Sequence, residues 1–338
     1  MLDTLIHMTH VDSPYCSIQI QIQAPIFSHA LLNSPMGLAT LAAGLPLWIA
    51  DMMNHRVRRV DENGTMTTVA GSGDMGYSGD GHHARCARMS MPVAVAVNAD
   101  GTLLWISDSG NAVVRLVHPN HVIVTIVGTG VAGDAGDGGP AFAAQLSGSF
   151  GGIFVRPDGA QLWIADTWNN RIRTVFPNGT IATVAGHASR SYGGDGGVAT
   201  EAGLFGPLDI AVDGAGNLWI SDSANQALRV VDATTGIIST RMSALRYGKG
   251  VAVSADGARV WVVESLTSAR LRMLNTSTNV VTTVAGGFTG SSFNGDAVPA
   301  AGTALREPGA VAYSVVDATI VIADTKNNRL RRVHPNGT

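Results

Sequence analysis

The chain has 338 residues, of which 45% are hydrophobic and only 14% are charged, and its formal net charge is −3. This composition supports a large apolar core and excludes an intrinsically disordered chain. The balance of charges also excludes the strongly basic surface that nucleic acids and acidic membranes attract, so we predict neither nucleic acid nor a membrane surface as the partner.

The first 16 residues are expected to form an N-terminal tail. They lack the basic region and apolar core of a secretory signal. No apolar run in the chain reaches the roughly 18 residues that span a bilayer, so we predict no membrane span. These features assign no compartment, and an extracellular location stays open if the chain is a fragment.

The two cysteines, Cys16 and Cys86, are too few for a disulfide framework or a metal cluster. We expect two free thiols, with a single bridge as the alternative. Residues 17–23, SIQIQIQ, alternate strictly between polar and apolar side chains. Such alternation is typical of a half-buried strand.

One pattern recurs from Pro35 to the end of the chain, clearest at residues 162–173, LWIADTWNNRIR. The intervals between its acidic residues are 57, 58, 56, 42 and 60 residues, and a fixed period of this size indicates a repeat architecture. The acidic residues of the six copies are Asp51, Asp108, Asp166, Asp222, Glu264 and Asp324.

Each repeat contains four short apolar runs separated by turn residues. In the third repeat they cover residues 152–155, 161–165, 171–176 and 181–185, with Asp158-Gly159 and Asn178-Gly179 between them. Asp-Gly and Asn-Gly pairs favour tight hairpins because both central residues must accept positive φ. Four antiparallel strands repeated six times predict an all-β fold, a six-bladed β-propeller that forms a single domain over residues 17–338.

The P-x-G-x-A-V, L-W-I-A-D-T-x-N-N-R-I-R and N-G-T-I-x-T-V-A-G segments resemble the NHL repeat family, over nearly the whole chain from about Pro35. The resemblance implies the propeller fold first of all. The long form of the repeat, with its glycine-rich insertion, is similar to the NHL repeats of bacterial surface proteins and of the teneurin ectodomain.

The insertions follow the fourth strand and contain small residues at helical spacing, such as Ala84, Ala87 and Met89. We predict one short helical turn against the blade edge in each insertion. The connection between Thr240 and Gly250 lacks the insertion, which explains the 42-residue interval. The insertions carry Gly79-Asp80-Gly81, Gly136-Asp137-Gly138, Gly194-Asp195-Gly196 and, in altered form, Asn294-Gly295-Asp296.

The last repeat contains three strands and no fourth. Because unpaired strand edges are a liability, we predict that residues 17–23 supply the outer strand of blade 6 and close the ring. The alternative is that the true last strand follows Thr338. Deleting residues 1–24 should unfold the protein only in the first case.

The strand order predicts that the Asp-x-x-Asn-x-Arg turns and the insertions emerge on one face of the ring. The recurring acid is expected to accept backbone N–H bonds in its own turn, and the recurring arginine to pair between blades. These arginines are Arg58, Arg115, Arg173, Arg229, Arg272 and Arg331.

The face with the insertions is the chemically rich one, and loops on a rigid scaffold are where binding residues usually lie. A second set of arginines is irregular, which hints at function, although solvated strand ends would explain it too. Trp168 lies in a turn and could anchor an interface. We therefore predict a non-catalytic scaffold for protein binding, its partner unidentified, through Asp80, Asp137, Asp195, Asp296, Arg56, Arg171, Arg329 and Trp168.

Two alternatives involve metals. The Gly-Asp-Gly loops invite Ca²⁺, but each brings only one or two carboxylates, so we favour Asp-stabilised turns and predict no cofactor. Some six-bladed relatives are lactonases or lyases with a metal at the channel mouth. The predicted first strands offer one carboxylate, Asp209, and no histidine. We predict no catalytic or metal-ligating residue and keep a metal-dependent, lactonase-like hydrolase or lyase as the alternative.

Overall fold

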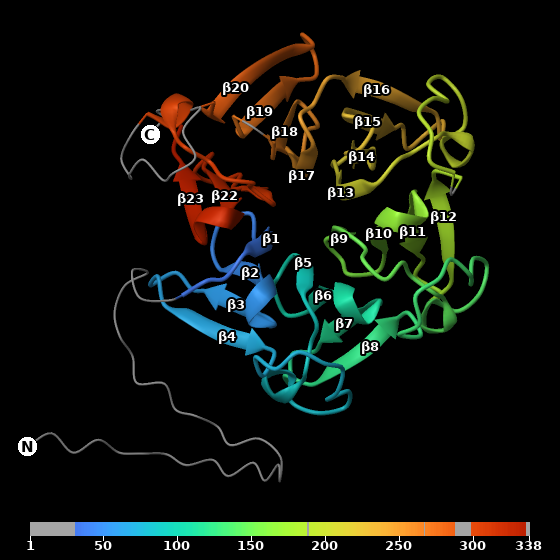
Figure 1. Cartoon of the computed structure of the whole chain (residues 1–338), viewed down its shortest axis with the longest axis vertical. Helices are drawn as coiled ribbons and strands as arrows, with labels where there is room; N and C mark the ends of the chain where they lie inside the picture. The colour runs from blue at the N-terminus through green and yellow to red at the C-terminus, as the bar shows by residue number, and fades with distance from the viewer. Residues whose placement is uncertain (1–30, 188, 267, 288–298, 336–338) are drawn as a thin grey trace, which may run out of the picture.

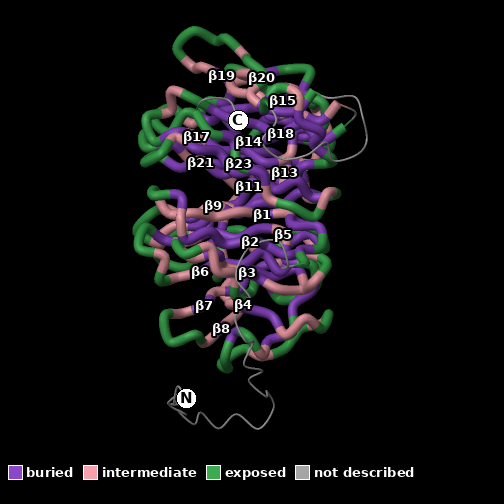
Figure 2. The backbone as a smooth tube through the Cα atoms, turned by 90° about the vertical axis from the view of Figure 1, so that its left-hand side faces the viewer, coloured by how far each residue is buried: buried purple, intermediate pink, exposed green. Residues whose placement is uncertain are grey.

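The structure is a computed structural model that describes residues 31–335, except residues 188, 267 and 288–298. Within these residues six antiparallel sheets form a ring around a central channel (Figure 1). Seen edge-on, the buried strands fill the interior of the ring and the exposed residues gather in its loops (Figure 2). The predicted six-bladed β-propeller is confirmed. The tail of residues 1–16, the strand of residues 17–23 and Asp296 lie outside the described residues.

The first three blades each contain four strands, ordered from the channel outward as they follow in the chain. Blade 1 comprises β1 (Pro35–Thr40), β2 (Leu47–Asp51), β3 (Arg56–Val60) and β4 (Met66–Ala70). Blade 2 comprises β5 (Pro92–Val97), β6 (Leu104–Asp108), β7 (Val113–Val117) and β8 (Ile123–Val127). Blade 3 comprises β9 (Ile153–Val155), β10 (Leu162–Asp166), β11 (Arg171–Val175) and β12 (Ile181–Ala185).

The next two blades repeat this order, and blade 6 has three strands within the described residues. Blade 4 comprises β13 (Pro207–Val212), β14 (Leu218–Asp222), β15 (Ala227–Val231) and β16 (Ile238–Met242). Blade 5 comprises β17 (Gly248–Val253), β18 (Arg259–Glu264), β19 (Arg270–Asn275) and β20 (Val280–Gly286). Blade 6 comprises β21 (Val311–Tyr313), β22 (Ile320–Asp324) and β23 (Arg329–Val333).

Both faces of each blade pack against neighbouring blades, which explains why the second strands are apolar without alternation. Trp48 of β2, for example, belongs to one buried cluster with Val95 and Leu104 of blade 2. Trp105 of β6 likewise packs with Ile153 of blade 3. These indoles fill the spaces between blades, where a large flat ring buries much apolar area.

The helical residues form short 3₁₀ turns. Four follow the second strands: η1 (Met52–Asn54), η3 (Ser109–Asn111), η5 (Thr167–Asn169) and η8 (Thr325–Asn327). The other four lie in the insertions: η2 (Ala84–Cys86), η4 (Ala141–Ala143), η6 (Ala199–Glu201) and η7 (Ala300–Gly302). In the described part of the chain, no helix has the length and apolarity to cross a bilayer.

The insertion turns confirm the helical turn predicted at the blade edge. Ala84, Ala87 and Met89 are completely buried, so the small residues at helical spacing are the ones that pack inward. Cys86 ends η2 and is disulfide-bonded, so the expectation of free thiols is wrong there.

The connection between blades 4 and 5 lacks an insertion, as its short interval predicted. Other contacts take its place. Leu245 is buried in the gap, and its N–H bonds the carbonyl of Gln226. At the outer edge, Arg241 of blade 4 donates to Asn279 Oδ1 of blade 5 at 2.8 Å. The shortened repeat is therefore joined to its neighbour by side chains from both blades.

Candidate functional site

The turns that follow the second strands share one face of the ring with the starts of the first strands. In blade 2, Pro92 at the start of β5 pairs with Asp108 at the end of β6. The N–H of Gly110 in η3 bonds the carbonyl of Ser90, where the preceding insertion returns. We call the face that carries η1, η3, η5 and η8 the insertion face.

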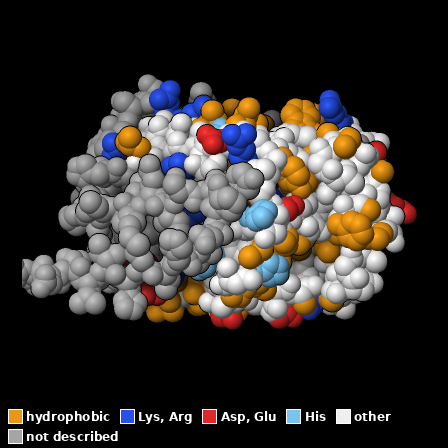
Figure 3. Space-filling view, turned by 90° about the horizontal axis from the view of Figure 1, so that it is seen from below, with side chains coloured by type: hydrophobic (Ala, Val, Ile, Leu, Met, Phe, Trp, Pro, Cys, Tyr) orange, Lys and Arg blue, Asp and Glu red, His pale blue; other side chains and the backbone are white. Residues whose placement is uncertain are grey.

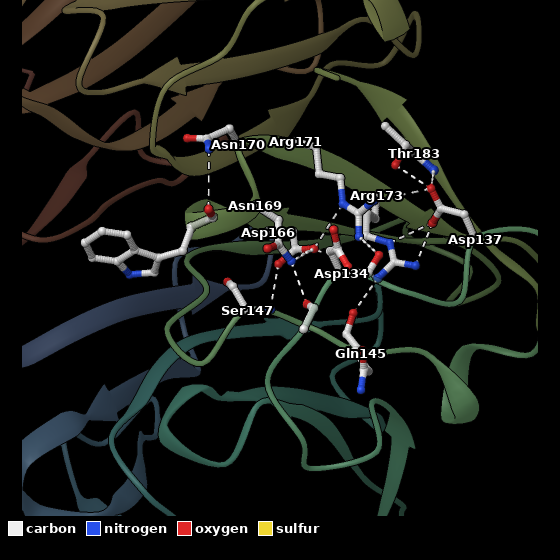
Figure 4. A network of polar contacts seen from close by, with 12 residues as sticks. Asp134, Asp137, Gln145, Ser147, Asp166, Asn169, Asn170, Arg171, Arg173 and Thr183 are labelled. Carbon is white, nitrogen blue, oxygen red and sulfur yellow. Dashed lines mark hydrogen bonds and ion pairs between the residues drawn. The ribbon is translucent and has the colours of Figure 1, made fainter. Parts of the chain in front are cut away.

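Blade 3 shows how the recurring acid works (Figure 4). The buried Asp166 accepts hydrogen bonds from the N–H of Ser147 at 2.9 Å and from the side chain of Asn169 at 2.9 Å. Asn169 also donates to the carbonyl of Gly133 at 2.7 Å. Both Ser147 and Gly133 belong to the insertion that arrives from blade 2. The Asp-x-x-Asn motif therefore holds that insertion against the blade.

This arrangement corrects one expectation, that the acid accepts N–H bonds within its own turn. Asp166 accepts no backbone N–H of η5, and its one bond within that turn comes from the side chain of Asn169. Near its end, the insertion has a backbone N–H that no strand partner accepts, and this N–H lies beside the buried carboxylate. The same bond recurs from Asn33 to Asp51, Ser90 to Asp108, Phe205 to Asp222 and Arg306 to Asp324.

Three of the six recurring arginines pair between blades, as predicted. The ion pairs found for Arg58, Arg272 and Arg331 are instead with the acid of their own blade. Arg173 is completely buried, and it donates to Asp137 at 2.6 Å and to the carbonyl of Gln145 at 2.7 Å (Figure 4). Both partners belong to the insertion from blade 2. The equivalent pairs are Arg115 with Asp80 at 2.6 Å and Arg229 with Asp195 at 2.7 Å. A buried guanidinium with several acceptors is the arrangement in which such a pair is tolerated.

The predicted binding acids Asp80, Asp137 and Asp195 are thus the partners of buried arginines. Their side chains are 35–45% exposed, and they lie at the rim beside the outer strand of the next blade. Asp137 accepts bonds from both the N–H and the hydroxyl of Thr183 in β12. Burial alone would raise the pKa of Asp137, but the bonds from Thr183 and Arg173 hold it below its usual range.

The two glycines beside Asp137 have different roles. Gly136 has a φ of 105°, and a Cβ on it would lie 2.5 Å from the Cα of Ala144. Gly138 has a φ of 82° but faces open space. The first glycine permits close packing and the second only a left-handed backbone. The motif therefore encodes the path of the insertion, and its aspartate reaches the rim rather than the insertion face.

The irregular arginines occupy different environments. Arg171 is buried and contacts Asp166 at 3.2 Å, Asp137 at 3.6 Å and the carbonyl of Asp134. Arg56 is half-buried and donates to the carbonyl of Ser72 at 2.8 Å. Arg171 thus holds the insertion that arrives from blade 2, whereas Arg56 holds the start of the insertion that leaves its own blade. Arg329 is exposed.

Trp168 is 61% exposed in η5. It is one of several large apolar side chains that this face presents to solvent. They come from two recurring places, the middle of the turn after the second strand and the residues just before the first strand. We call this set the apolar ring: Met53, Met91, Trp168, Phe205, Tyr247 and Leu266.

Two members of this ring, and one residue outside it, have an uncommon backbone conformation. Met91, Tyr247 and Glu307, each just before a first strand, have φ values of 48°, 55° and 44°. The N–H of Met91 is fixed by a 3.1 Å bond to Nδ1 of His55 in blade 1. Strained non-glycine positions of this kind often gather at functional sites. Sequence patterns missed these residues because no strand periodicity includes them.

The central channel encloses about 220 Å³ and is lined by apolar residues of the first strands. Among the described first strands, Asp209 is the only carboxylate. It accepts a 2.9 Å bond from the N–H of Val251 in blade 5, and burial raises its pKa to about 7. In the described part of the chain, no group of three or more His, Cys, Asp or Glu side chains is placed to hold a metal ion.

No family model matches the chain. Mouse teneurin-1 is 28% identical over 227 residues, which cover 60% of this chain and 8% of teneurin-1. The chain thus spans less than a tenth of that relative. A streptogramin B lyase matches the structure with a TM-score of 0.57 and 14% identity, over 92% of this chain and 83% of the lyase. A gluconolactonase from Xanthomonas campestris matches with a TM-score of 0.56 and 14% identity, over 86% and 84%. At these identities the two structures share the fold alone.

Proposed function

We propose that this NHL-type β-propeller is a non-catalytic platform that binds another protein through its insertion face. The observation that carries the proposal is the apolar ring, whose six members come from blades 1 to 5. Exposed apolar groups on one face cost free energy in water, and monomeric proteins rarely keep large patches of them without a use.

Trp168 is the proposed anchor of the interface. Its indole is the largest side chain of the ring and is more exposed than the other five members. Tryptophan is enriched among residues that dominate binding energy, because it buries a large area while losing little conformational freedom. Arg329 in blade 6 is exposed and would supply a polar contact at the edge of the ring.

The remaining residues of the predicted site have a supporting role in this proposal. Arg56 and Arg171 hold insertion backbone in place. Asp80, Asp137 and Asp195 neutralise buried arginines, and their carboxylates stay partly exposed at the rim. Asp296 lies outside the described residues and stays a prediction.

The charge of the surface agrees with a protein partner rather than a nucleic acid. The net charge is −3, and three of the arginine–aspartate pairs above use their positive charge internally. On the side of the ring that Figure 3 shows, outside its grey atoms, basic side chains are scattered among acidic and apolar ones. A scattered distribution gives no continuous track for a phosphate backbone.

The test is a capture experiment with matched variants. Immobilised wild-type protein, Trp168→Ala and Phe176→Ala would be exposed to extract from the source organism, and bound proteins identified by mass spectrometry. Phe176 is an exposed aromatic that follows β11, at the opposite end of its strand from η5. Proteins retained by wild type and Phe176→Ala but lost with Trp168→Ala support the proposal. Identical sets from all three would contradict it.

The alternative is a metal-dependent hydrolase or lyase at the channel mouth, and Asp209 is the observation that favours it. A single carboxylate is a poor start for a site that needs three protein ligands. Elemental analysis after a chelator rinse, with Ca²⁺ included, would decide. About one tightly held ion per chain would favour the enzyme. A protein that retains no metal ion would contradict the metal-dependent enzyme.

A further inference from the structure

The boundary between blades 4 and 5 lacks the insertion that covers the outer edge of blades 2, 3 and 4. In those three blades the arriving insertion brings an aspartate, which links the recurring arginine to a threonine of the outer strand. In blade 3, Asp137 contacts Arg173 at 2.6 Å and accepts a hydrogen bond from the hydroxyl of Thr183 at 2.6 Å. Blades 2 and 4 repeat this arrangement around Asp80 and Asp195. Each of these blades therefore offers a place for a carboxylate, and the insertion fills it.

Blade 5 has the arginine and the threonine, but no described residue takes the place of the aspartate. Arg272 of β19 lies opposite Thr283 of β20, at the register of the corresponding pair in blade 3. Among the described residues, Arg272 makes no hydrogen bond, and its one ion pair is a 3.6 Å contact with Glu264. Its side chain is 22% exposed, whereas that of Arg173 is completely buried. Thr283 is exposed as well, so both donors are accessible from solvent.

The backbone of the outer strand is uncovered at the same edge. In blade 3, Ile181 exchanges two backbone hydrogen bonds with the insertion, at 2.8 and 3.0 Å. Val281 has the equivalent register in β20, which lies at the outer edge of the ring (Figure 1). Val281 makes no such bond within the described residues, and it is partly exposed, whereas Ile181 is completely buried. We call Arg272, Val281 and Thr283 the open edge.

The charges at this boundary favour an acidic ligand. In blade 3, two arginines are paired with two aspartates. In blade 5, Arg270 and Arg272 contact the same buried carboxylate, that of Glu264, at 2.6 and 3.6 Å. Arg241 of blade 4 adds a third guanidinium, which bonds Asn279 in the turn before β20. A second carboxylate at Arg272 would restore the balance of charge and would gain a charge-assisted hydrogen bond, which is stronger than a neutral one.

We propose that the open edge binds an extended, glycine-rich segment of another protein that carries an aspartate. The backbone of the segment would pair with Val281 by β-strand addition, and its carboxylate would accept bonds from Arg272 and Thr283. The chain's own connection at this boundary, residues 243–247, is too short to supply such a segment. The open edge lies in blade 5 and Trp168 in blade 3, so the proposal does not depend on the anchor proposed above.

The test uses one of the chain's own insertions as the probe. Blade 3 is the matching blade, because its Arg171 and Arg173 correspond to Arg270 and Arg272. The probe is therefore a fluorescein-labelled peptide with the sequence of residues 132–146, AGDAGDGGPAFAAQL. Its binding to the full-length protein would be followed by fluorescence anisotropy. We expect saturable binding that weakens as salt is added, because salt screens a partly exposed ion pair.

Matched variants locate the site. Asp137→Asn in the peptide, or Arg272→Gln in the protein, should each weaken binding about tenfold or more, because each removes a charge-assisted bond. Combining both changes should weaken binding little further, since they remove the same bond. Arg259→Gln, at the exposed start of β18 in the same blade, and Trp168→Ala should leave the affinity unchanged.

Thr283→Asp supplies the missing carboxylate within the protein itself. This variant should block the peptide without lowering the midpoint of thermal unfolding, and it carries the test if Arg272→Gln does not fold. The absence of saturable binding would overturn the proposal. Binding that neither Arg272→Gln nor Thr283→Asp weakens would overturn it too, because the peptide would then be bound elsewhere.

Discussion

The side chain of Asn328 in blade 6 accepts a 2.8 Å hydrogen bond from the N–H of Ser34, which precedes blade 1, although 294 residues separate them. The same contact joins Asn170 to Gly206 at 3.0 Å and His55 to Met91 at 3.1 Å. The hydroxyl of Thr325 also bonds the carbonyl of Pro35 at 2.7 Å. The two ends of the ring are therefore joined by the same type of bond as consecutive blades.

Replacing Asn328 by alanine should destabilise the closed ring. The substitution removes the acceptor for Ser34 and places alanine at a φ of 53°, a left-handed conformation that asparagine tolerates better. We expect a loss of about 1–3 kcal/mol in the free energy of unfolding, measured by urea denaturation. Asn328→Asp retains an acceptor and should recover most of the stability. Equal losses in both variants would refute this role of the side chain.

The two glycines around Asp137 should differ in their tolerance of alanine. A Cβ at Gly136 would meet the backbone of Ala144 at 2.5 Å, whereas one at Gly138 would meet nothing. Gly138→Ala should cost about 1 kcal/mol for the left-handed backbone alone. Gly136→Ala should cost several times more and lower the midpoint of thermal unfolding clearly further. Similar midpoints for the two variants would show that the insertion does not pack as described.

The buried and exposed arginine–aspartate pairs offer a second matched comparison. Arg173 is completely buried with Asp137 and Asp166, whereas Arg156 pairs with Asp158 on the surface at 2.8 Å. Arg173→Met removes the buried donor to Asp137 and to the carbonyl of Gln145, and leaves Asp166 with Arg171 as its cation; it should cost about 3–5 kcal/mol. Arg156→Met should leave the thermal midpoint almost unchanged, because solvent screens the exposed pair. Comparable effects would contradict the structural role of the recurring arginine.

Asp209 should make stability depend on pH. Burial raises its pKa to about 7 in the folded protein, against an ordinary value of 3.8 for an aspartate. The folded state therefore binds more protons between these values, so this contribution is complete below about pH 4 and is lost as the pH rises through 7. Asp209→Asn removes the effect while keeping an acceptor for Val251. Relative to wild type, the variant should gain stability between pH 5 and pH 8, by on the order of 2 kcal/mol.

The measurement is urea unfolding of both proteins at the two pH values. Asp108, whose pKa is raised to about 6 by burial, titrates in the same direction. Because Asp108 is present in both proteins, its contribution cancels in the difference. A difference between wild type and variant that stays constant from pH 5 to pH 8 would rule out a titrating Asp209.

Trp168 should dominate collisional quenching of tryptophan fluorescence. It is 61% exposed, whereas Trp48, Trp105, Trp219 and Trp261 are buried and Trp163 is intermediate. Acrylamide should quench one fraction of the emission strongly, and Trp168→Phe should remove most of that fraction without changing the unfolding midpoint. Unchanged quenching would mean that the indole is not presented to solvent, and the proposed anchor would fail with it.

Much of the fold could be predicted from the sequence because each structural pattern recurs in several repeats. The Asn-Gly and Asp-Gly pairs, the apolar runs and the small residues of the insertions predicted six blades and a helical turn beside them, and both are confirmed. The NHL resemblance is confirmed as well. A residue that occurs in one repeat only is harder to interpret. Asp209 and Lys249 each replace an apolar residue in a single first strand, and their surroundings depend on the closed ring.

The candidate site was less predictable for a physical reason. Sequence order placed the insertions at one face, but Gly136 and Gly138 direct the chain outward, and Asp137 ends beside Thr183 at the rim. The partner of a buried arginine cannot be identified from spacing when it lies in the preceding blade. Tyr247 was missed for a different reason. It lies between two strands, where no periodic pattern marks it, and only the structure shows that it is exposed to solvent.

The missing insertion between blades 4 and 5 breaks the rotational equivalence of the ring. That boundary has no interleaved segment with a buried arginine–aspartate pair, and it relies on Leu245, Arg241 and the bond from Val251 to Asp209. A ring of equivalent joints has no preferred point of rupture under tension. This ring does, and a force that stretches it is expected to separate blades 4 and 5 first, leaving one open arc of six blades in which the other boundaries stay joined.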